Sequence, residues 1–360
     1  VGVGRFTSPD TMVSQIRRGV LDFIGGARAG IADPFLPTKI REGRSDDIRE
    51  CIGCNICIAS WHDGVPVRCT QNATAGEEWR RGWHPEHFTK TDKPSSVLIV
   101  GGGPSGLEAA LVAARQGFDV TIAERDDDWG GRVLKESQLP GMASWRRVRD
   151  YRVWALSQMG NVSMFTNSEL DPDAIQNFGA DHIALATGAH WTRHLYSALE
   201  IPITPLTMPQ VFTPDDVFAG NVTGDRLLVF DFDHYYLGGV IAEHLAIGGK
   251  QVTYATPAGD ASAWTFMTNE LPFVYQALAR EDVAIHTTTN LISFDGTHAT
   301  VANLFNQTAL ELAVDGIVIV GHRVPNDALY EALITSTGSS KNQSSVSLVG
   351  DAQAPGAIVH

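Results

Sequence analysis

The sequence predicts an α/β protein in which strands and helices alternate along most of the chain. A buried strand over 96–100 runs into a glycine-rich turn and then a helix over 107–116. A similar strand–helix–strand pattern recurs over 226–255, and the first 48 residues also alternate short apolar strands with helices. Alternation of this kind is typical of parallel sheets whose faces are covered by helices.

The length of the chain indicates how many domains it forms, and its charge excludes some classes of partner. Its 360 residues, 43% of them hydrophobic, are enough for two or three domains with separate cores. The 27 basic and 41 acidic side chains give a formal charge of −14, which argues against nucleic acid or an anionic membrane as a partner. No apolar run reaches the ~18 residues of a membrane span. We therefore expect a soluble, cytoplasmic protein.

Residues 1–48 predict two β/α units. Ser8 is a helix N-cap and Pro9 suits the first helical position. Two units cannot close a barrel, so they belong either to a small open sheet or to part of a longer protein. The expected elements are a strand end over Val1–Phe6, a helix over Thr11–Arg18, a strand over Val20–Gly25 and a helix from Ala32 towards Gly43.

Small residues and an arginine follow each of these two strands. They are Val3-Gly4-Arg5 and Gly25-Gly26-Ala27-Arg28. In barrel enzymes, the loops after the last two strands bind phosphate through backbone amides. The pattern therefore favours the C-terminal end of a (β/α)8 barrel, although a single Gly-Arg pair is more often a tight turn with a solvated cation.

All four cysteines lie within nineteen positions, with the spacing C-x2-C-x2-C followed by a fourth. Three thiolates packed within seven residues suit one side of a [4Fe–4S] cluster, and a fourth from a nearby loop reaches the remaining iron. Zinc is the alternative, but structural zinc sites usually present two separated C-x2-C pairs. Disulfides or buried free thiols would make the clustering accidental. The predicted ligands are Cys51, Cys54, Cys57 and Cys69.

The glycine-rich turn after residue 100 predicts a dinucleotide site. Gly101, Gly103 and Gly106 have the G-x-G-x-x-G spacing between a strand and a helix, and Ser105 lies among them. Glu124 ends the next strand, 18 residues beyond the last glycine, where an acid would hold a ribose hydroxyl.

Three later segments agree with this prediction. Thr187-Gly188 resembles the strand end that flavoproteins with two dinucleotide domains place near the crossover between them. Gly350-Asp351 resembles a flavoprotein motif whose aspartate faces the flavin ribityl chain, and Gly131-Arg132 fits the segment that passes beside the same nucleotide. Each could be an ordinary turn, but their order predicts a bound adenine nucleotide.

The pattern over 226–255 is an imperfect copy of 97–124 at an offset near 130. Asp231, Asp233 and Tyr236 stand where the first copy has its three glycines. Two carboxylates and a bulky ring would repel or displace a pyrophosphate, so we expect no working NAD(P)H site. A helix near 271–279 and strands over 284–288, 291–294, 299–304 and 316–320 are expected to complete this second domain.

Several of these residues together resemble a known family. Arg28 followed by Ala32-Asp33-Pro34, the cysteine loop, and the run from Cys69-Thr70-Gln71-Asn72 to Trp83-His84-Pro85 resemble the trimethylamine and dimethylamine dehydrogenase group. That group belongs to the old-yellow-enzyme-like iron–sulfur flavoproteins, with 2,4-dienoyl-CoA reductase and histamine dehydrogenase. The resemblance implies an FMN barrel, then the cluster, then two dinucleotide-fold domains.

The resemblance also implies site residues and missing parts. Arg5, Ala27 and Arg28 would contact FMN, with Arg28 as the phosphate partner. About six barrel strands would precede Val1, and the catalytic residues would lie there, so they are unknown from this sequence. The first dinucleotide domain would hold ADP, as in the amine dehydrogenases, or FAD, as in the dienoyl-CoA reductase.

These inferences divide the chain into four expected parts. They are the last barrel units over 1–48, the cluster segment and linker over 49–93, a first Rossmann-like domain over 94–224 plus 326–360, and a second over 225–325.

The leading functional hypothesis is the electron-transfer portion of an amine dehydrogenase-like oxidoreductase. A small alkylamine would be oxidatively N-demethylated, and electrons would pass from FMN to the cluster and on to an electron-transferring flavoprotein. A homodimer is expected from the resemblance. The alternatives are an NAD(P)H-dependent enoate or 2,4-dienoyl-CoA reductase and a non-enzymatic electron carrier or ADP-binding module.

Overall fold

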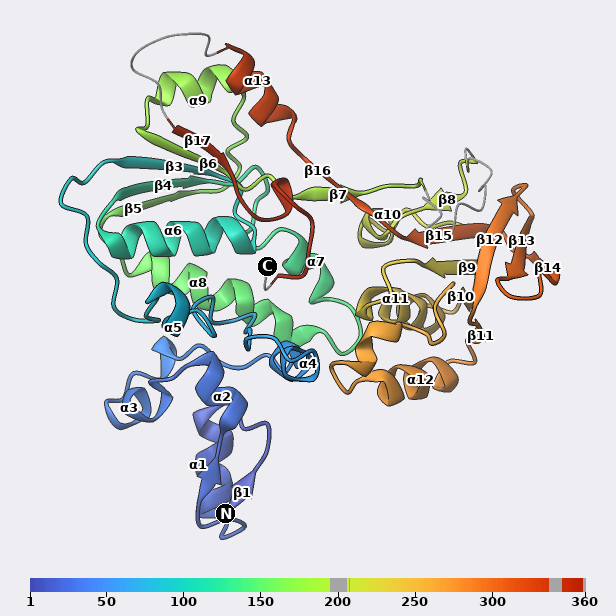
Figure 1. The fold of residues 1–360 in the computed structure, drawn as a ribbon, viewed down its shortest axis with the longest axis horizontal. Helices are drawn as coiled ribbons and strands as arrows, with labels where there is room; N and C mark the ends of the chain where they lie inside the picture. The colour runs from blue at the N-terminus through green and yellow to red at the C-terminus, as the bar shows by residue number, and fades with distance from the viewer. Residues whose placement is uncertain (195–205, 207, 337–344, 359–360) are drawn as a thin grey trace. The chain divides into compact units, whose positions relative to one another are not determined.

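The computed structural model describes residues 1–194, 206, 208–336 and 345–358 (Figure 1). The chain forms two compact units, which are treated separately below. The first comprises Val1–Gln138, Met142–Gly188 and Pro325–His360, and the second comprises Leu139–Gly141 and Ala189–Val324. This division falls earlier than the expected boundary at 224/225, because strand β8 (Val211–Phe212) pairs with the second sheet. None of the helices in the described ranges has the length and apolar character of a membrane span.

The N-terminal part of the first unit is a β-α-β arrangement. Strands β1 (Gly2–Val3) and β2 (Ile24–Gly25) pair in parallel around helix α1 (Pro9–Arg17). The predicted strand over Val20–Gly25 is therefore only two residues long. A complete barrel stays a prediction.

The expectation of one helix from Ala32 towards Gly43 is wrong. Helix α2 (Ala27–Ala32) ends there, and α3 (Leu36–Arg41) begins after Pro34. Proline disfavours helical backbone in the residue before it, and Asp33 is extended. The buried Asp33 carboxylate accepts a 2.8 Å bond from Lys39 Nζ and a 2.9 Å bond from Arg49 N, which fixes the break.

A cysteine-bearing segment and a Rossmann-like domain complete the first unit. The segment holds short helices, namely η1 (Ser45–Asp47), α4 (Ile56–His62) and α5 (Glu78–Arg81). The domain's strands are β3 (Ser96–Val100), β4 (Asp119–Ala123), β5 (Val162–Phe165), β6 (His182–Leu185) and β17 (Ser345–Leu348). Its helices are α6 (Pro104–Gln116), α7 (Arg132–Glu136), η2 (Ala143–Arg146), α8 (Arg147–Ser157), α9 (Pro172–Phe178), α13 (Ala328–Ser336) and η4 (Gly350–Ala352).

The five strands form one parallel sheet in the order β17-β6-β3-β4-β5, which confirms the predicted parallel α/β class. Alternate residues of β3 face opposite sides of this sheet. Ile99 packs with α6 and α8 on one face, whereas Leu98 and Val100 pack with α9 and α13 on the other (Figure 1). Both faces are therefore covered.

The turn from β3 to α6 depends on close backbone contact. Gly101 has φ 106°, and a Cβ there would press on the Ala186 carbonyl carbon at 2.8 Å. A Cβ on Gly106 would collide with the Gly101 carbonyl oxygen, whereas nothing lies within 4 Å of a Cβ on Gly103. The first and third glycines thus seat the helix against the strand, and the second faces open space.

Over its described residues, the second unit contains a parallel sheet, a smaller antiparallel sheet, the paired strands β7 and β16, and three α-helices. The parallel sheet has the order β11-β10-β9-β15-β8, and the antiparallel sheet has the order β12-β13-β14. The strands not yet given are β7 (Ala189–Trp191), β9 (Arg226–Asp231), β10 (Gln251–Ala255), β11 (Ala284–His286), β12 (Thr289–Phe294), β13 (His298–Asn303), β14 (Ala309–Ala313), β15 (Gly316–Val320) and β16 (Arg323–Pro325). The helices are α10 (Pro214–Phe218), α11 (Tyr236–Ile247) and α12 (Leu271–Arg280), with a short η3 (Ala263–Phe266).

The three central strands of the two parallel sheets have the same arrangement. In the first sheet β3 lies between β4 and β6, and in the second sheet β9 lies between β10 and β15. The sequence pattern missed β14, whose ALELA residues are mostly exposed and so carry no buried face.

The offset of 130 between the copies holds for the first strand, β3 against β9, but becomes 132 for the helix and for the next strand, β4 against β10. Helix α6 begins at Pro104 and α11 at Tyr236, so the second turn is two residues longer. The third glycine therefore corresponds to Gly238 and not to Tyr236. A Cβ on Gly238 would lie 2.7 Å from Asp231 Cβ, so the close approach of helix and strand is kept.

The Asp231 side chain fills the space beneath this turn. It is fully buried, and its Oδ1 accepts bonds from Asp233 N at 3.1 Å and His234 N at 3.0 Å. The Tyr254 hydroxyl donates to its Oδ2, and Ser262 N donates to that hydroxyl at 2.8 Å. Burial raises the pKa of Asp231 to about 7.

We predict that Gly106→Ala destabilises the first unit by roughly 1–3 kcal/mol, because the new methyl group would displace α6 from β3. Chemical denaturation followed by circular dichroism measures the change. The matched control is Gly103→Ala, which has room for a methyl group and should keep wild-type stability. Equal stability of both variants would contradict this account of the turn.

We predict that Asp231 makes the second unit less stable at higher pH. The folded protein holds the Asp231 proton up to about pH 7, whereas the unfolded chain releases it near the ordinary value of 3.8. Stability is therefore lost as the pH rises from about 4 through about 7, by on the order of 4 kcal/mol. Urea denaturation at several pH values between 4 and 8 gives the free energy of unfolding at each pH. This free energy should fall less steeply with rising pH in Asp231→Asn than in wild type. The exposed Asp225→Asn is the control, and an unchanged slope in Asp231→Asn would refute the assignment.

Candidate functional site

The predicted nucleotide residues of the first unit meet at the start of α6. Glu124 is buried, and its Oε2 accepts a 2.6 Å bond from Gly102 N while its Oε1 accepts a 2.9 Å bond from Asp126 N. The acid therefore lies beside the glycine turn, as expected of a ribose partner. Its contact with a ribose stays a prediction.

The segment containing Gly131 and Arg132 lies on the same turn. Gly130 N donates to the Gly102 carbonyl at 2.9 Å, and a Cβ on Gly131 would lie 3.4 Å from Gly103 Cα. Arg132 forms a 2.7 Å ion pair with the fully buried Glu136 and lies 3.4 Å from Asp351.

The remaining predicted residues come from β6 and the C-terminal segment. Thr187 Oγ1 donates to the Asn326 carbonyl at 2.6 Å, and Asn326 N donates to the Gly188 carbonyl at 2.9 Å. A Cβ on Gly350 would lie 2.5 Å from Ser105 Cβ, so the Asp351 segment packs on the start of α6.

All these residues therefore gather at the carboxyl ends of β3 and β6. From β3 the chain adds β4 and β5 on one side of the sheet, and it then adds β6 on the other side of β3. The strand order therefore reverses at β3. Ligands bind at such switch points in open parallel sheets. Gly103 faces open space at this point, and a nucleotide bound there stays a prediction.

The three-cysteine turn has an unusual backbone. Gly53 has φ 74° and Asn55 has φ 57°, so a residue in the left-handed conformation lies on each side of Cys54. Helix α4 then begins at Ile56. Glycine and asparagine are the residues that tolerate this conformation best. The C-x2-C-x2-C spacing is thus shaped into a turn by the two residues between the thiols.

The four thiols lie near one another and are partly shielded from water. All four cysteines are free and half-buried. Burial raises the pKa of Cys54 to about 11 and also raises the pKa values of the Cys57 and Cys69 thiols. Each of these three shifts also includes the charges of other cysteines of the set, so the four thiols are neighbours.

Hydrogen bonds to the sulfurs oppose the effect of burial. The backbone of Ile56 bonds Cys54, that of Ile58 bonds Cys57, and those of Gln71 and Asn72 bond Cys69, each lowering the thiol pKa. The Thr70 hydroxyl lies 3.2 Å from Cys54 Sγ. Such bonds to sulfur are one of the means by which proteins tune iron–sulfur clusters.

The spacing of the thiols bears on which metal group they fit. Within the described ranges, no three or more His, Cys, Asp or Glu side chains are arranged to hold a single metal ion. A tetrahedral zinc with Zn–S bonds of ~2.3 Å would need sulfurs about 3.8 Å apart. A cluster spreads its thiolates over four iron corners, whereas zinc draws them to one point. Which of the two groups these thiols hold stays a prediction.

The residues after Cys69 tie this segment to its surroundings. Gln71 Nε2 donates to the Glu50 and Arg147 carbonyls at 3.0 and 3.3 Å, and Asn72 Nδ2 donates to the Ile31 carbonyl at 3.0 Å. Both side chains are 1% exposed. The run Thr70-Gln71-Asn72 thus contacts the cysteine turn, α8 and α2. These residues form part of the family resemblance, but the sequence did not predict their hydrogen bonds.

The predicted FMN residues lie beside the cysteine turn. Ala27 and Arg28 begin α2, and Arg28 NH1 donates a 2.5 Å bond to Asn55 Oδ1. The Arg5 guanidinium packs on Gly53, since a Cβ there would lie 2.8 Å from Arg5 Cζ. FMN contacts stay a prediction. Asn55 is a residue that the sequence reasoning missed, although its place inside the C-x2-C-x2-C motif was a signal.

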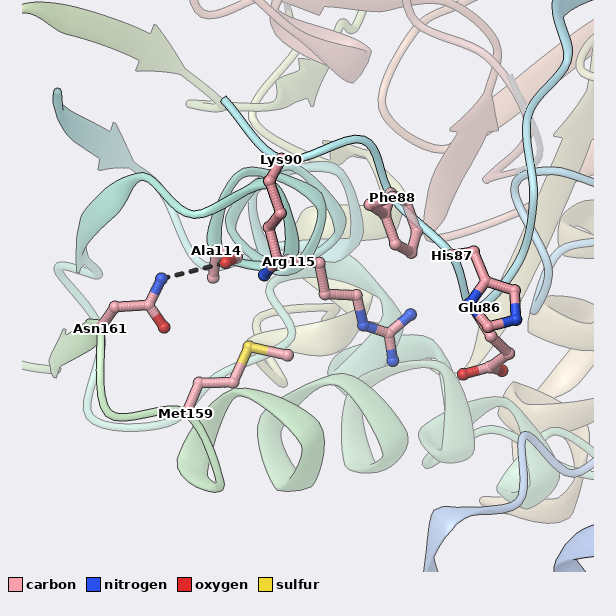
Figure 2. A pocket seen from close by; sticks show the side chains of 8 residues that line it. All are labelled: Glu86, His87, Phe88, Lys90, Ala114, Arg115, Met159 and Asn161. Carbon is pink, nitrogen blue, oxygen red and sulfur yellow. Dashed lines mark hydrogen bonds between the residues drawn. The ribbon is translucent and has the colours of Figure 1, made fainter. Parts of the chain in front are cut away.

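A separate hollow of about 390 Å³ lies away from these sites. Figure 2 shows that the linker and the C-terminal end of α6 line it, with Asn161 bonded to the Ala114 carbonyl. Arg115 extends below Phe88 and lies 5.4 Å from the Phe88 ring centroid. No predicted cofactor residue is among those that line this hollow.

Comparison with known proteins agrees with this geometry. Residues 99–165 match the family model of an NAD(P)-binding Rossmann-like domain. The chain is 42% identical to dimethylamine dehydrogenase of Hyphomicrobium sp. (strain x) over 269 residues, which is 72% of this chain and 36% of that protein.

Two solved structures match almost all of the chain. Histamine dehydrogenase from Rhizobium sp. 4-9 is 42% identical with a TM-score of 0.94, covering 99% of this chain and 56% of that one. The 6-hydroxypseudooxynicotine amine oxidase of Pseudomonas geniculata N1 is 44% identical with a TM-score of 0.96, covering 99% and 54%. The chain thus spans slightly more than half the length of these two structures, and its match covers 36% of dimethylamine dehydrogenase. In sequence and fold it belongs to the dimethylamine dehydrogenase-like iron–sulfur flavoproteins, a family of oxidoreductases.

Proposed function

We propose that this chain is the electron-transfer portion of an amine dehydrogenase. A small alkylamine is oxidatively N-demethylated, and electrons leave through the cysteine segment to an electron-transferring flavoprotein. The observation that carries the proposal is the contact between the two predicted FMN arginines and the cysteine turn. It joins the expected flavin site to the expected cluster site within one unit.

Each residue set has a distinct task in this proposal. When bound, FMN and a [4Fe–4S] cluster supply electron acceptance from the amine and single-electron delivery onwards. Arg28 binds the flavin phosphate and, through Asn55, holds the turn that bears Cys51, Cys54 and Cys57. Partial burial of Cys54 and Cys57 limits the contact of their sulfur atoms with water. The proton-handling residues lie outside the chain, and the assembly is a cytoplasmic homodimer.

The first nucleotide site is proposed to hold ADP and not FAD. Asp351 is the residue expected to face a ribityl chain, but its carboxylate lies 3.4 Å from Arg132 and accepts a 3.0 Å bond from Gly356 N. A ribityl group would have to replace these partners, whereas a nucleotide that ends at its diphosphate would not. The glycine turn and Glu124 serve either ligand equally.

The turn of the second copy supports a closed NAD(P)H site. The Asp233 and His234 amides, which lie in this turn, donate to the buried Asp231 carboxylate. They are therefore satisfied inside the protein. A phosphate would also meet the charge of Asp233, at a cost of roughly a kcal/mol or more near a surface.

An NAD(P)H-dependent enoate or dienoyl-CoA reductase is the second candidate. The match of residues 99–165 to an NAD(P)-binding model favours it, because it assigns a dinucleotide to the Gly101 turn. A non-enzymatic electron carrier or ADP-binding module is the third. The two tests below separate these candidates.

We predict that Cys69→Ser lowers cluster content at least several-fold, because the fourth iron loses its thiolate while the three-cysteine turn remains. Iron, acid-labile sulfide and the broad visible absorption band of anaerobically reconstituted protein measure this. Val65→Ser, an exposed change in the same loop, is the matched control. Stoichiometric zinc without sulfide in anaerobically isolated wild-type protein would defeat the cluster assignment.

We predict that neither NADH nor NADPH reduces the flavin of the holoenzyme at a useful rate, because the second turn binds its own carboxylate. Anaerobic stopped-flow absorbance with each nucleotide, and with a small alkylamine, measures the rate. Bleaching only by the amine supports the dehydrogenase. Fast bleaching by either nucleotide would favour the reductase, and bleaching by none of the three would leave the non-enzymatic module as the better account.

A further inference from the structure

The hydrogen bond between Arg28 and Asn55 links two sites that the sequence treated separately. Arg28 NH1 lies 2.5 Å from Asn55 Oδ1, and both side chains belong to the first unit. Asn55 lies between Cys54 and Cys57 in the chain. The bond therefore joins the expected flavin-phosphate arginine to the middle of the expected cluster loop.

Asn55 controls the geometry of that loop. Its left-handed backbone ends the turn, and its carbonyl accepts the first bonds of α4, from Ile58 N at 2.9 Å and Ala59 N at 3.0 Å. Its side chain makes no capping bond to the helix backbone and instead accepts the Arg28 bond. The position of Arg28 thus fixes the residue that sets the direction of Cys54 and Cys57.

Charge is the second part of the argument. Arginine stays protonated at all ordinary pH values, so Arg28 brings a permanent positive charge to the loop. Arg5 brings another, because its guanidinium packs on Gly53. Four thiolates make a cluster site strongly negative, and reduction potentials of clusters depend on net charge and hydrogen bonds near the sulfurs.

We propose that Arg28 is a positioning residue for the cluster, which acts through Asn55 to raise the cluster's reduction potential. The proposal rests on the proposed function for the presence of the cluster. In a one-electron couple, the reduced cluster carries one more negative charge than the oxidised cluster. A fixed positive charge nearby therefore favours the reduced form, and the same guanidinium that meets the flavin phosphate eases electron arrival at the cluster.

The test is an anaerobic redox titration of the cluster followed by electron paramagnetic resonance. FMN-free, cluster-reconstituted protein is used, so that altered flavin binding cannot contribute. Arg28→Gln should shift the midpoint potential to a lower value, whereas Arg28→Lys, which keeps the charge, should restore most of it. The control is Arg41→Gln, which removes the same charge from an exposed position on α3 and should leave the potential unchanged.

The variant Asn55→Gly tests the hydrogen bond to Arg28 without changing the backbone conformation of the turn. Glycine adopts the left-handed conformation without strain, so this variant removes only the side chain that receives the bond. It should lower the potential in the same direction as Arg28→Gln. The double variant should be lowered by less than the sum of the two, because both changes remove one interaction.

The possible outcomes distinguish this proposal from the proposed function. Wild-type protein that takes up no iron and sulfide would defeat both. Full cluster content in Arg28→Gln with the potential of Arg41→Gln would overturn the role of Arg28 and leave the proposed function standing. If Arg28→Gln loses its cluster, Arg28→Lys and Asn55→Gly decide the matter, and wild-type potentials in both would overturn the proposal.

Discussion

The first unit depends on two buried amide side chains that follow the last cysteine. Gln71 bonds backbone carbonyls before and beyond the cysteine turn, and Asn72 bonds the end of α2. An unpaired amide at 1% exposure would cost about 1–3 kcal/mol, so these bonds specify where the segment lies. These polar contacts therefore help to hold the cysteine turn between the N-terminal β-α-β part and the nucleotide domain, together with the buried Ile52 and Ile56 of the turn.

The two nucleotide-fold turns show how one scaffold supports different sites. In the first, Gly101 and Gly106 let the helix approach the strand while Gly103 faces open space. In the second, Gly238 keeps that approach, but Asp231 occupies the space and binds the turn's own amides. In both sheets the central strand lies between the next strand of the chain and a later one. The two turns differ by two added residues and one carboxylate.

Much of the fold and of the candidate site follows from local pattern. The strands around Leu98 and Val229 were predicted because their residues are apolar without interruption, as in sheets buried on both faces. The break at Pro34 was missed because the composition on either side of it favours a helix. Tyr236 was aligned with the third glycine because sequence offset alone cannot reveal a lengthened turn.

The sequence by itself determined the cysteine spacing, the glycine turn and the family, since each depends on residues close together in the chain. Only the tertiary structure decided that Arg28 bonds Asn55, that Arg132 pairs with Asp351, and that Asp231 lies buried under its own turn. The partners in the two arginine pairs are 27 and 219 residues apart in sequence. Such contacts depend on how helices and strands pack, and local periodicity carries no information about packing between distant elements.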